Sequence, residues 1–409
     1  MKSRAKFHSA CIAFGFAALA ISTSASATVH RVFPGGSIQA TIDAASPGDT
    51  ILVEPGTYYG SDPTYGLRID KDNLRLIGKT DNGKGKPGKV RVLYVAGSQQ
   101  KTGVYAAPAG CDYDVKADSP LGVDCNGRKL KGFYIRGFTV EGFPVNGIQT
   151  RWVDGFEFVS NESVRNLNNG IYPTLSANGL VRDNVSYGSL DTAMWIAASE
   201  NVRVIGNKLF GSVIGFEITV SNNVWGTQNK IYGNTVGIGL FHPNGAGNPP
   251  LPVMANWVVE HNEVYDNNLF PNPAPPGSFQ ADLPSGIGIL LAGVSDHVIA
   301  KNRVEGNGYV GIGVLGWCTA LAGGPRECDF SRPDLGLVYP PQANNNLIAL
   351  NYVSDNGGSP PGGFPLPPVD LLYVQFEPGA GGNCFEKNKP RTFSFFSSEP
   401  DGLLPTDGC

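Results

Sequence analysis

The sequence predicts an all-β protein built as a solenoid, in which short strands repeat along the chain. Three observations predict this fold. An asparagine follows a short apolar run seven times, the first two intervals are both 23 residues, and 54 glycines and 31 prolines supply many tight turns. Each repeat of a solenoid buries its apolar face only against its neighbours. The recurring residues are Asn161, Asn184, Asn207, Asn234, Asn262, Asn302 and Asn351.

The later intervals between these asparagines lengthen to 27, 28, 40 and 49 residues, which indicates insertions into a regular repeat. A turn asparagine tolerates the left-handed conformation, and its side-chain amide can bond to the asparagine of the next coil. We therefore expect the asparagine column to be structural.

The first 27 residues have the pattern of a secretory signal peptide. Lys2, Arg4 and Lys6 form a basic start, 11–21 is apolar, and Ala25-Ser26-Ala27 is a small-residue cleavage site before Thr28. Elsewhere the longest apolar stretch, 286–294, is too short to span a bilayer. We expect an exported protein, periplasmic or extracellular, without a membrane span.

The composition of the mature chain excludes one class of partner and indicates disulfides. It carries 28 basic and 35 acidic residues, a net charge of −7, and lacks the basic patch of a nucleic-acid-binding protein. Six cysteines remain after cleavage, an even number that suits an oxidising compartment. We expect neighbours in sequence to pair; zinc binding, the alternative, would need closer cysteine spacing. The expected pairs are Cys111–Cys125, Cys318–Cys328 and Cys384–Cys409.

A short helix is predicted at the start of the mature chain. Ser37 is a suitable N-cap, and Ile38, Thr41, Ile42 and Ala45 share one helical face. A turn and a β run, Thr50-Ile51-Leu52-Val53, follow it. Such a helix would cover the open end of a solenoid, where unpaired backbone otherwise invites aggregation.

This segment, SIQATIDAASPGDTILVEPGTY, resembles the N-terminal cap of right-handed parallel β-helix proteins of the pectin-lyase-like superfamily. The later N-x-V coils resemble the repeats of that group. The resemblance covers most of 29–375 and implies a single β-helix domain over 28–375, followed by a C-terminal tail or cap at 376–409 that a disulfide ties down. The fold itself hosts many activities.

Glycines repeat with the same period, and the strand that follows each one has a middle residue that should face outward. Long insertions at 241–254, 268–285 and 317–344 lie beside the same sheet and should form walls around it. An extended sugar chain is a reasonable occupant of the resulting groove. The expected outward column is Gln149, Tyr172, Trp195, Glu217, Gly239, Gly288 and Gly313.

Four residues near this column are candidates for catalysis. Glu217 or His242 would act as base or acid, and Arg151 and Asp191 would bind substrate or metal. A lyase needs a cation, a base and an acid, whereas a hydrolase uses paired carboxylates. The alternative is that these residues are ordinary solvated charges on a sheet.

Aromatic and amide side chains of the column and insertions are the expected substrate contacts. Their rings can stack on sugar faces, or can simply cover the sheet by packing on each other. The residues are Gln149, Tyr172, Trp195, Phe241 and Trp317.

Three functions remain open from the sequence. The first is a polysaccharide lyase or epimerase acting on an anionic polymer, with Ca²⁺ as a conceivable cofactor. The motifs of the superfamily's polygalacturonases, mannuronan epimerases and pectate lyases are missing, so no catalytic residue is carried over from them. The second is a non-catalytic envelope or surface module that binds glycans. The third is a copper-accessory protein with the same repeats, for which the mature chain offers few methionine and histidine ligands.

Overall fold

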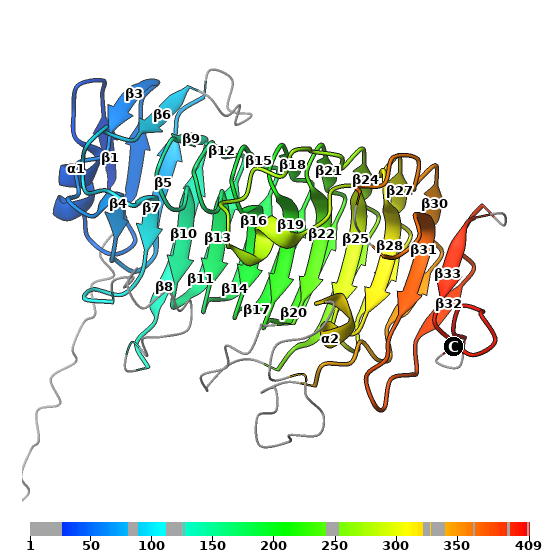
Figure 1. The fold of residues 1–409 in the computed structure, drawn as a ribbon. Coiled ribbons are helices and arrows are strands. Elements are labelled where there is room, and N and C mark those ends of the chain that lie inside the picture. Colours follow the sequence, from blue (N-terminus) through cyan, green and yellow to red (C-terminus); the bar gives the residue numbers. More distant parts are fainter. Residues whose placement is uncertain are drawn as a thin grey trace, which may run out of the picture.

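A computed structural model describes residues 27–80, 89–111, 125, 127–242, 253–321, 328, 340–362, 365–390, 393–406 and 409 of the chain. Except for Ala27, the predicted signal peptide lies outside the described residues. In the described part, the coils stack along one axis, and their strands form three parallel sheets of 12, 11 and 10 strands (Figure 1). This arrangement confirms the expected right-handed parallel β-helix. Each coil contributes about one strand to every sheet.

The strand bounds follow the repeat. The first sheet contains β1 (Val29–Val32), β2 (Thr50–Val53), β5 (Leu74–Gly78), β8 (Leu130–Arg136), β11 (Val153–Val159), β14 (Ala177–Arg182), β17 (Glu200–Ile205), β20 (Asn222–Thr227), β23 (Ala255–Glu260), β26 (Val298–Ala300), β29 (Leu347–Ala349) and β32 (Cys384–Glu386). The second sheet contains β4 (Tyr65–Ile69), β7 (Thr102–Ala106), β10 (Ile148–Arg151), β13 (Ile171–Thr174), β16 (Thr192–Ala197), β19 (Ile214–Thr219), β22 (Val236–Phe241), β25 (Ile287–Ala292), β28 (Val310–Leu315), β31 (Val369–Val374) and β33 (Phe395–Ser397). The third sheet contains β3 (Gly56–Tyr59), β6 (Val90–Leu93), β9 (Phe138–Glu141), β12 (Glu162–Val164), β15 (Val185–Tyr187), β18 (Lys208–Phe210), β21 (Lys230–Tyr232), β24 (Glu263–Tyr265), β27 (Arg303–Glu305) and β30 (Tyr352–Ser354).

The interior of the β-helix is filled by alternate residues of these strands. In β17, Val202 and Val204 are completely buried, whereas Arg203 between them is exposed. Side chains of a strand point to opposite faces in turn, so every coil sends its apolar residues inward. One continuous apolar core therefore runs the length of the stack.

Asparagine ladders confirm the structural role expected for the repeat and correct one of its members. Asn184 donates from its backbone and side-chain nitrogens to Asn207 Oδ1, at 2.9 and 3.0 Å. The next member is Asn229, not Asn234, so the interval there is 22 residues rather than 27. Asn234 belongs to a second ladder, in which it donates to Asn267 Oδ1.

The outward column of the second sheet agrees with the expected register from Gln149 to Gly239 but differs at the next strand. Gly239 pairs with Leu290, which in turn pairs with Gly313. The expected member Gly288 is therefore wrong by two residues. A shift of two keeps every side chain on the same face, so the in–out alternation of the sequence could not decide between the two registers.

The ends of the stack are closed by local structure. Helix α1 (Ile38–Ala44) begins at the predicted N-cap Ser37 and covers the first coils (Figure 1). The side chain of Gln39 accepts from Arg68 N at 2.7 Å and donates to Arg68 O at 3.1 Å, so it pairs the backbone of the edge strand β4. At the other end, β32 and β33 extend two sheets beyond residue 375.

All three expected disulfides are present, joining Cys111 to Cys125, Cys318 to Cys328 and Cys384 to Cys409. This pairing is consistent with an exported protein, because disulfides persist in oxidising compartments. The helices in the described part of the chain lack the length and apolarity of a membrane-crossing segment.

Candidate functional site

The second sheet has an outward face on which the structure gathers most of the candidate residues. At the middle of this face the rings of Tyr172 and Trp195, on β13 and β16, stack with centroids 4.7 Å apart. Trp195 is half-buried and its Nε1 donates to Thr219 Oγ1 at 2.9 Å, whereas Tyr172 is buried. The indole thus offers a partly exposed, oriented apolar surface next to the strand that carries Glu217.

Asp191 and Glu217 form a carboxyl pair directly beside this stack. Thr192, which begins β16, has its Oγ1 2.6 Å from Glu217 Oε2 and 3.1 Å from Asp191 Oδ1. A hydroxyl has one proton to donate, so it can donate to only one of the two carboxyl groups at a time. The other contact is a hydrogen bond when the carboxyl group is itself protonated.

Burial raises the pKa of both acids. The pKa of Asp191 rises to about 7, mainly because burial penalises its charged form, while bonds from Thr192 and Gln280 act in the opposite direction. The pKa of Glu217 is raised well above its ordinary value by burial and then by the negative charge of Asp191. Two like charges this close disfavour double ionisation, so the pair retains a proton at neutral pH.

The second insertion covers the carboxyl pair. It contains the one-turn helix η2 (Phe279–Asp282), from which Gln280 bonds to Asp191. Only 8% of Asp191 and 5% of Glu217 is exposed. In the next coil a Cβ on Gly239 would come within 2.4 Å of the Phe241 ring, so glycine at this position lets the ring lie across the strand.

The other two catalytic candidates lie away from this pair. Arg151 is on β10, three strands from β19, and its guanidinium carbon is 4.3 Å from the ring centroid of Trp152. Strand spacing puts roughly 14 Å between those coils. His242 follows β22 and stacks on Trp317, with ring centroids 5.2 Å apart.

The remaining expected substrate contacts fall into two groups. Gln149 is completely buried, and its Oε1 accepts from Asn146 Nδ2 at 2.9 Å, a bond that fixes the side chain within the protein. Phe241 and Trp317 are also buried, and both line a cavity further along the same face. In the strand order Trp195 on β16 and Phe241 on β22 are each one strand from Glu217 on β19, and Tyr172 on β13 is two strands from it.

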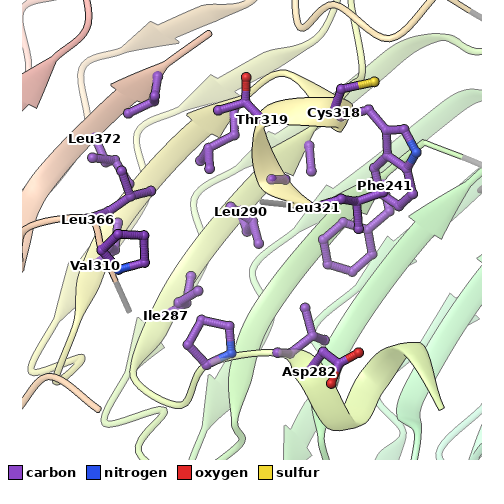
Figure 2. Close-up of a pocket in the computed structure, with 18 of the residues that line it drawn as sticks. Phe241, Asp282, Ile287, Leu290, Val310, Cys318, Thr319, Leu321, Leu366 and Leu372 are labelled. Carbon is purple, nitrogen blue, oxygen red and sulfur yellow. The ribbon is translucent and has the colours of Figure 1, made fainter. Parts of the chain in front are cut away.

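This cavity has a volume of about 1000 Å³ and lies over β22, β25, β28 and β31. Figure 2 shows Ile287, Leu290 and Val310 on its floor, with Asp282 of η2 on one side and Thr319 of α2 (Trp317–Ala320) on the other. Its walls are mainly apolar. A sugar chain, which needs hydrogen-bond partners for its hydroxyl groups, does not suit it.

Two residues of the site were not foreseen from the sequence. Thr192 is the common partner of both acids, and its position directly after Asp191 was an available but unspecific signal. Gln280 reaches Asp191 from an insertion 89 residues away in the chain, and nothing in the local sequence marks that contact.

Comparisons with known proteins agree on the fold. A family model described as "Periplasmic copper-binding protein (NosD)" matches residues 125–275. The A-module of mannuronan C-5 epimerase AlgE4 from Azotobacter vinelandii is 16% identical, with a TM-score of 0.56 over 88% of this chain and 95% of that one. DFA-IIIase from Arthrobacter chlorophenolicus A6 is 14% identical, with a TM-score of 0.55 over 90% and 87%. At these identities the two structures establish likeness of fold. Comparison with curated protein sequences finds no match.

The described residues do not fit a copper site. Met194 lies in the apolar core, and the two buried histidines, His242 and His297, stack on different tryptophans. In this part of the chain one group of three potential metal ligands occurs, formed by Cys384, Glu386 and Cys409, and its cysteines are joined in a disulfide. Copper prefers methionine, histidine or free thiolate ligands gathered at one place.

Proposed function

We propose that the protein binds a carbohydrate chain on the outward face of the second sheet and hydrolyses a glycosidic bond with Asp191 and Glu217. The observation that carries this proposal is the carboxyl pair itself: two buried acids that share one hydroxyl and have raised pKa values. Glycosidases use one protonated and one ionised carboxyl group, flanking the bond that breaks.

Burial raises the pKa of both acids, and the negative charge of Asp191 raises that of Glu217 further, so we place the proton of the pair on Glu217. Glu217 then donates its proton to the leaving glycosidic oxygen as the bond to the anomeric carbon breaks. Asp191, with a pKa of about 7, supplies the carboxylate that attacks the anomeric carbon and forms a glycosyl ester. Water then attacks the anomeric carbon and gives its proton to the Glu217 carboxylate, and the bond to Asp191 breaks to release the sugar. Retaining enzymes separate these groups by about 5–5.5 Å. Both acids bond to one hydroxyl oxygen here, which favours this short separation and therefore retention of configuration.

Lyase or epimerase action on an anionic polymer has less support from the geometry. Such chemistry needs a cation beside the substrate carboxylate, and Arg151 lies three strands from Glu217. A net charge of −7 in the mature chain also does not attract an anionic polymer.

The test is a reducing-end assay of the purified mature protein on neutral and acidic polysaccharides, with absorbance near 235 nm recorded in parallel. We expect new reducing ends on a neutral substrate. Glu217→Gln and Asp191→Asn should each lower the rate by about 10³-fold or more, because each removes one partner of the pair. Glu157→Gln, an exposed residue of β11, is the matched control and should keep full activity.

Other outcomes of that assay decide against hydrolysis. Absorbance at 235 nm without hydrolysis would show a lyase, and equal rates in Glu217→Gln and the wild type would remove the carboxyl pair from the mechanism. Binding without any product would favour the second candidate, a glycan-binding module. The near-complete cover of both acids by neighbouring residues is the observation that favours this candidate.

A further inference from the structure

We infer that the apolar cavity beside the carboxyl pair is a binding site for the alkyl chain of an amphiphile with an uncharged head group. This inference goes beyond the proposed hydrolysis and does not depend on it. The cavity is built outside the β-helix, on the surface of β22, β25, β28 and β31, and is distinct from the core that fills the interior.

The first argument is shape and lining. The floor consists of outward apolar residues on four consecutive strands, among them Phe241, Leu290, Leu315 and Leu372 (Figure 2). Three strand spacings span roughly 14 Å, about the length of a medium alkyl chain. Ligand sites typically have volumes of about 300–1,000 Å³ and mostly apolar walls with few polar groups. The volume of about 1000 Å³ is at the upper end of that range.

The second argument is that two added walls enclose this face. Phe279 of η2 packs against Phe241, with ring centroids 5.8 Å apart, and against Trp317, at 5.7 Å. Helix α2 is held by the Cys318–Cys328 disulfide and by Glu377, whose carboxylate accepts from Thr319 N at 2.7 Å. The two insertions contact each other through Phe279 and Trp317 at the rim of the cavity. The space over the sheet therefore stays open beneath them.

The third argument concerns the head group. The charged residues of the described lining are both acids, Asp282 and Glu377, and no lysine, arginine or histidine accompanies them. An anionic head group would therefore be repelled, whereas an uncharged head group would not.

The test uses N-phenyl-1-naphthylamine, an uncharged apolar fluorophore, as the probe and decanol and decanoate as competitors at pH 8. We expect saturable probe fluorescence that decanol displaces at a concentration at least tenfold lower than decanoate.

Two substitutions on the cavity floor locate the site. Leu290→Trp fills the cavity, and Leu290→Asn adds a polar amide while it keeps the branched shape; either should weaken probe binding at least tenfold. Leu403→Trp, the same change at a remote residue that is 57% exposed, is the control. Since Leu290 faces outward from the sheet, these variants should retain the β-helix, which circular dichroism would verify. Glu217→Gln should bind the probe as the wild type does, which separates this site from the proposed catalysis.

Three results would overturn the inference. They are the absence of saturable probe binding, unchanged binding in both Leu290 variants, and tighter binding of decanoate than of decanol.

Discussion

The hydroxyl of Thr192 connects the protonation of Asp191 to that of Glu217. Because it has one proton and contacts both acids, a bond to each requires that one carboxyl group act as donor. The burial that raises both pKa values also makes double ionisation costly for the folded protein. A site of this kind reduces stability in order to hold a proton at neutral pH, which is typical of catalytic acids.

The pH dependence of stability should report this cost. The ordinary pKa of an aspartate is 3.8, whereas the pKa of Asp191 in the folded protein is about 7. Between these values the unfolded chain has released a proton that the folded protein keeps, so stability falls as pH rises from about 4 to about 7. Asp191→Asn removes this dependence. Relative to the wild type it should gain up to about 4 kcal/mol of unfolding free energy between pH 4 and pH 8.

Chemical denaturation at pH 4 and pH 8 measures that difference. Asp183→Asn, at a side chain that is 50% exposed, is the matched control and should show no comparable gain. Parallel pH profiles for Asp191→Asn and the wild type would contradict the raised pKa.

Among the elements, the ladders between coils explain how a chain with irregular insertions keeps its register. Each buried asparagine bonds to the next coil whether the intervening loop is short or long: Asn207 to Asn229 spans 22 residues, and Asn262 to Asn302 spans 40. An insertion therefore leaves the stack unchanged on either side. At these turns the backbone N–H and the side-chain amide of an asparagine such as Asn184 are both bonded, although they are buried.

Removal of one rung should destabilise the stack. Asn207→Ala leaves two donors of Asn184 without an acceptor and deletes the bond to Val181 O. Because these groups are buried, we expect a loss of about 2–4 kcal/mol in unfolding free energy, measured by chemical denaturation. Asn201 is the control, because its side chain donates to Asn178 Oδ1 at an exposed position. Glycine readily adopts its backbone φ of 55°, so Asn201→Gly should cost about 1 kcal/mol or less. Equal losses in both variants would mean that burial of the ladder is unimportant.

The sequence predicted the asparagine ladder correctly where the repeat length is constant, and incorrectly at the first point where the repeat length changes. The 23-residue repeats located Asn161, Asn184 and Asn207 correctly because no insertion separates them. Where Asn229 and Asn234 stand five residues apart, both follow apolar runs, and only the stacking of neighbouring coils assigns them to different ladders. The sequence predicted Asp191 on the coil before Glu217 but with a different role: Glu217 as base or acid, and Asp191 in binding substrate or metal. Their common partner Thr192 and their cover by Gln280 depend on contacts between coils and loops.

At the scale of the whole molecule, the regular stack provides a rigid floor and the insertions provide what is specific to this chain. Two of the three disulfides, Cys111–Cys125 and Cys318–Cys328, lie within single connections between strands. The third joins β32 to the last residue. The disulfide at Cys318 holds α2, which forms one wall of the cavity, so its local effect should differ from that of the terminal disulfide.

Replacement of each disulfide by two alanines separates global stability from the shape of the cavity. The closed segments span 10 and 25 residues for Cys318–Cys328 and Cys384–Cys409. Loop-closure entropy then gives roughly 3 kcal/mol for either disulfide, so both variants should lose similar unfolding free energy. Binding of the naphthylamine probe should nevertheless weaken severalfold only in Cys318→Ala/Cys328→Ala, because only that change frees α2 to close over the space beneath it. Titration of both variants with the probe, at a temperature where circular dichroism shows both folded, makes the comparison. Equal weakening in Cys384→Ala/Cys409→Ala would show that the cavity depends on overall stability and not on the wall that α2 supplies.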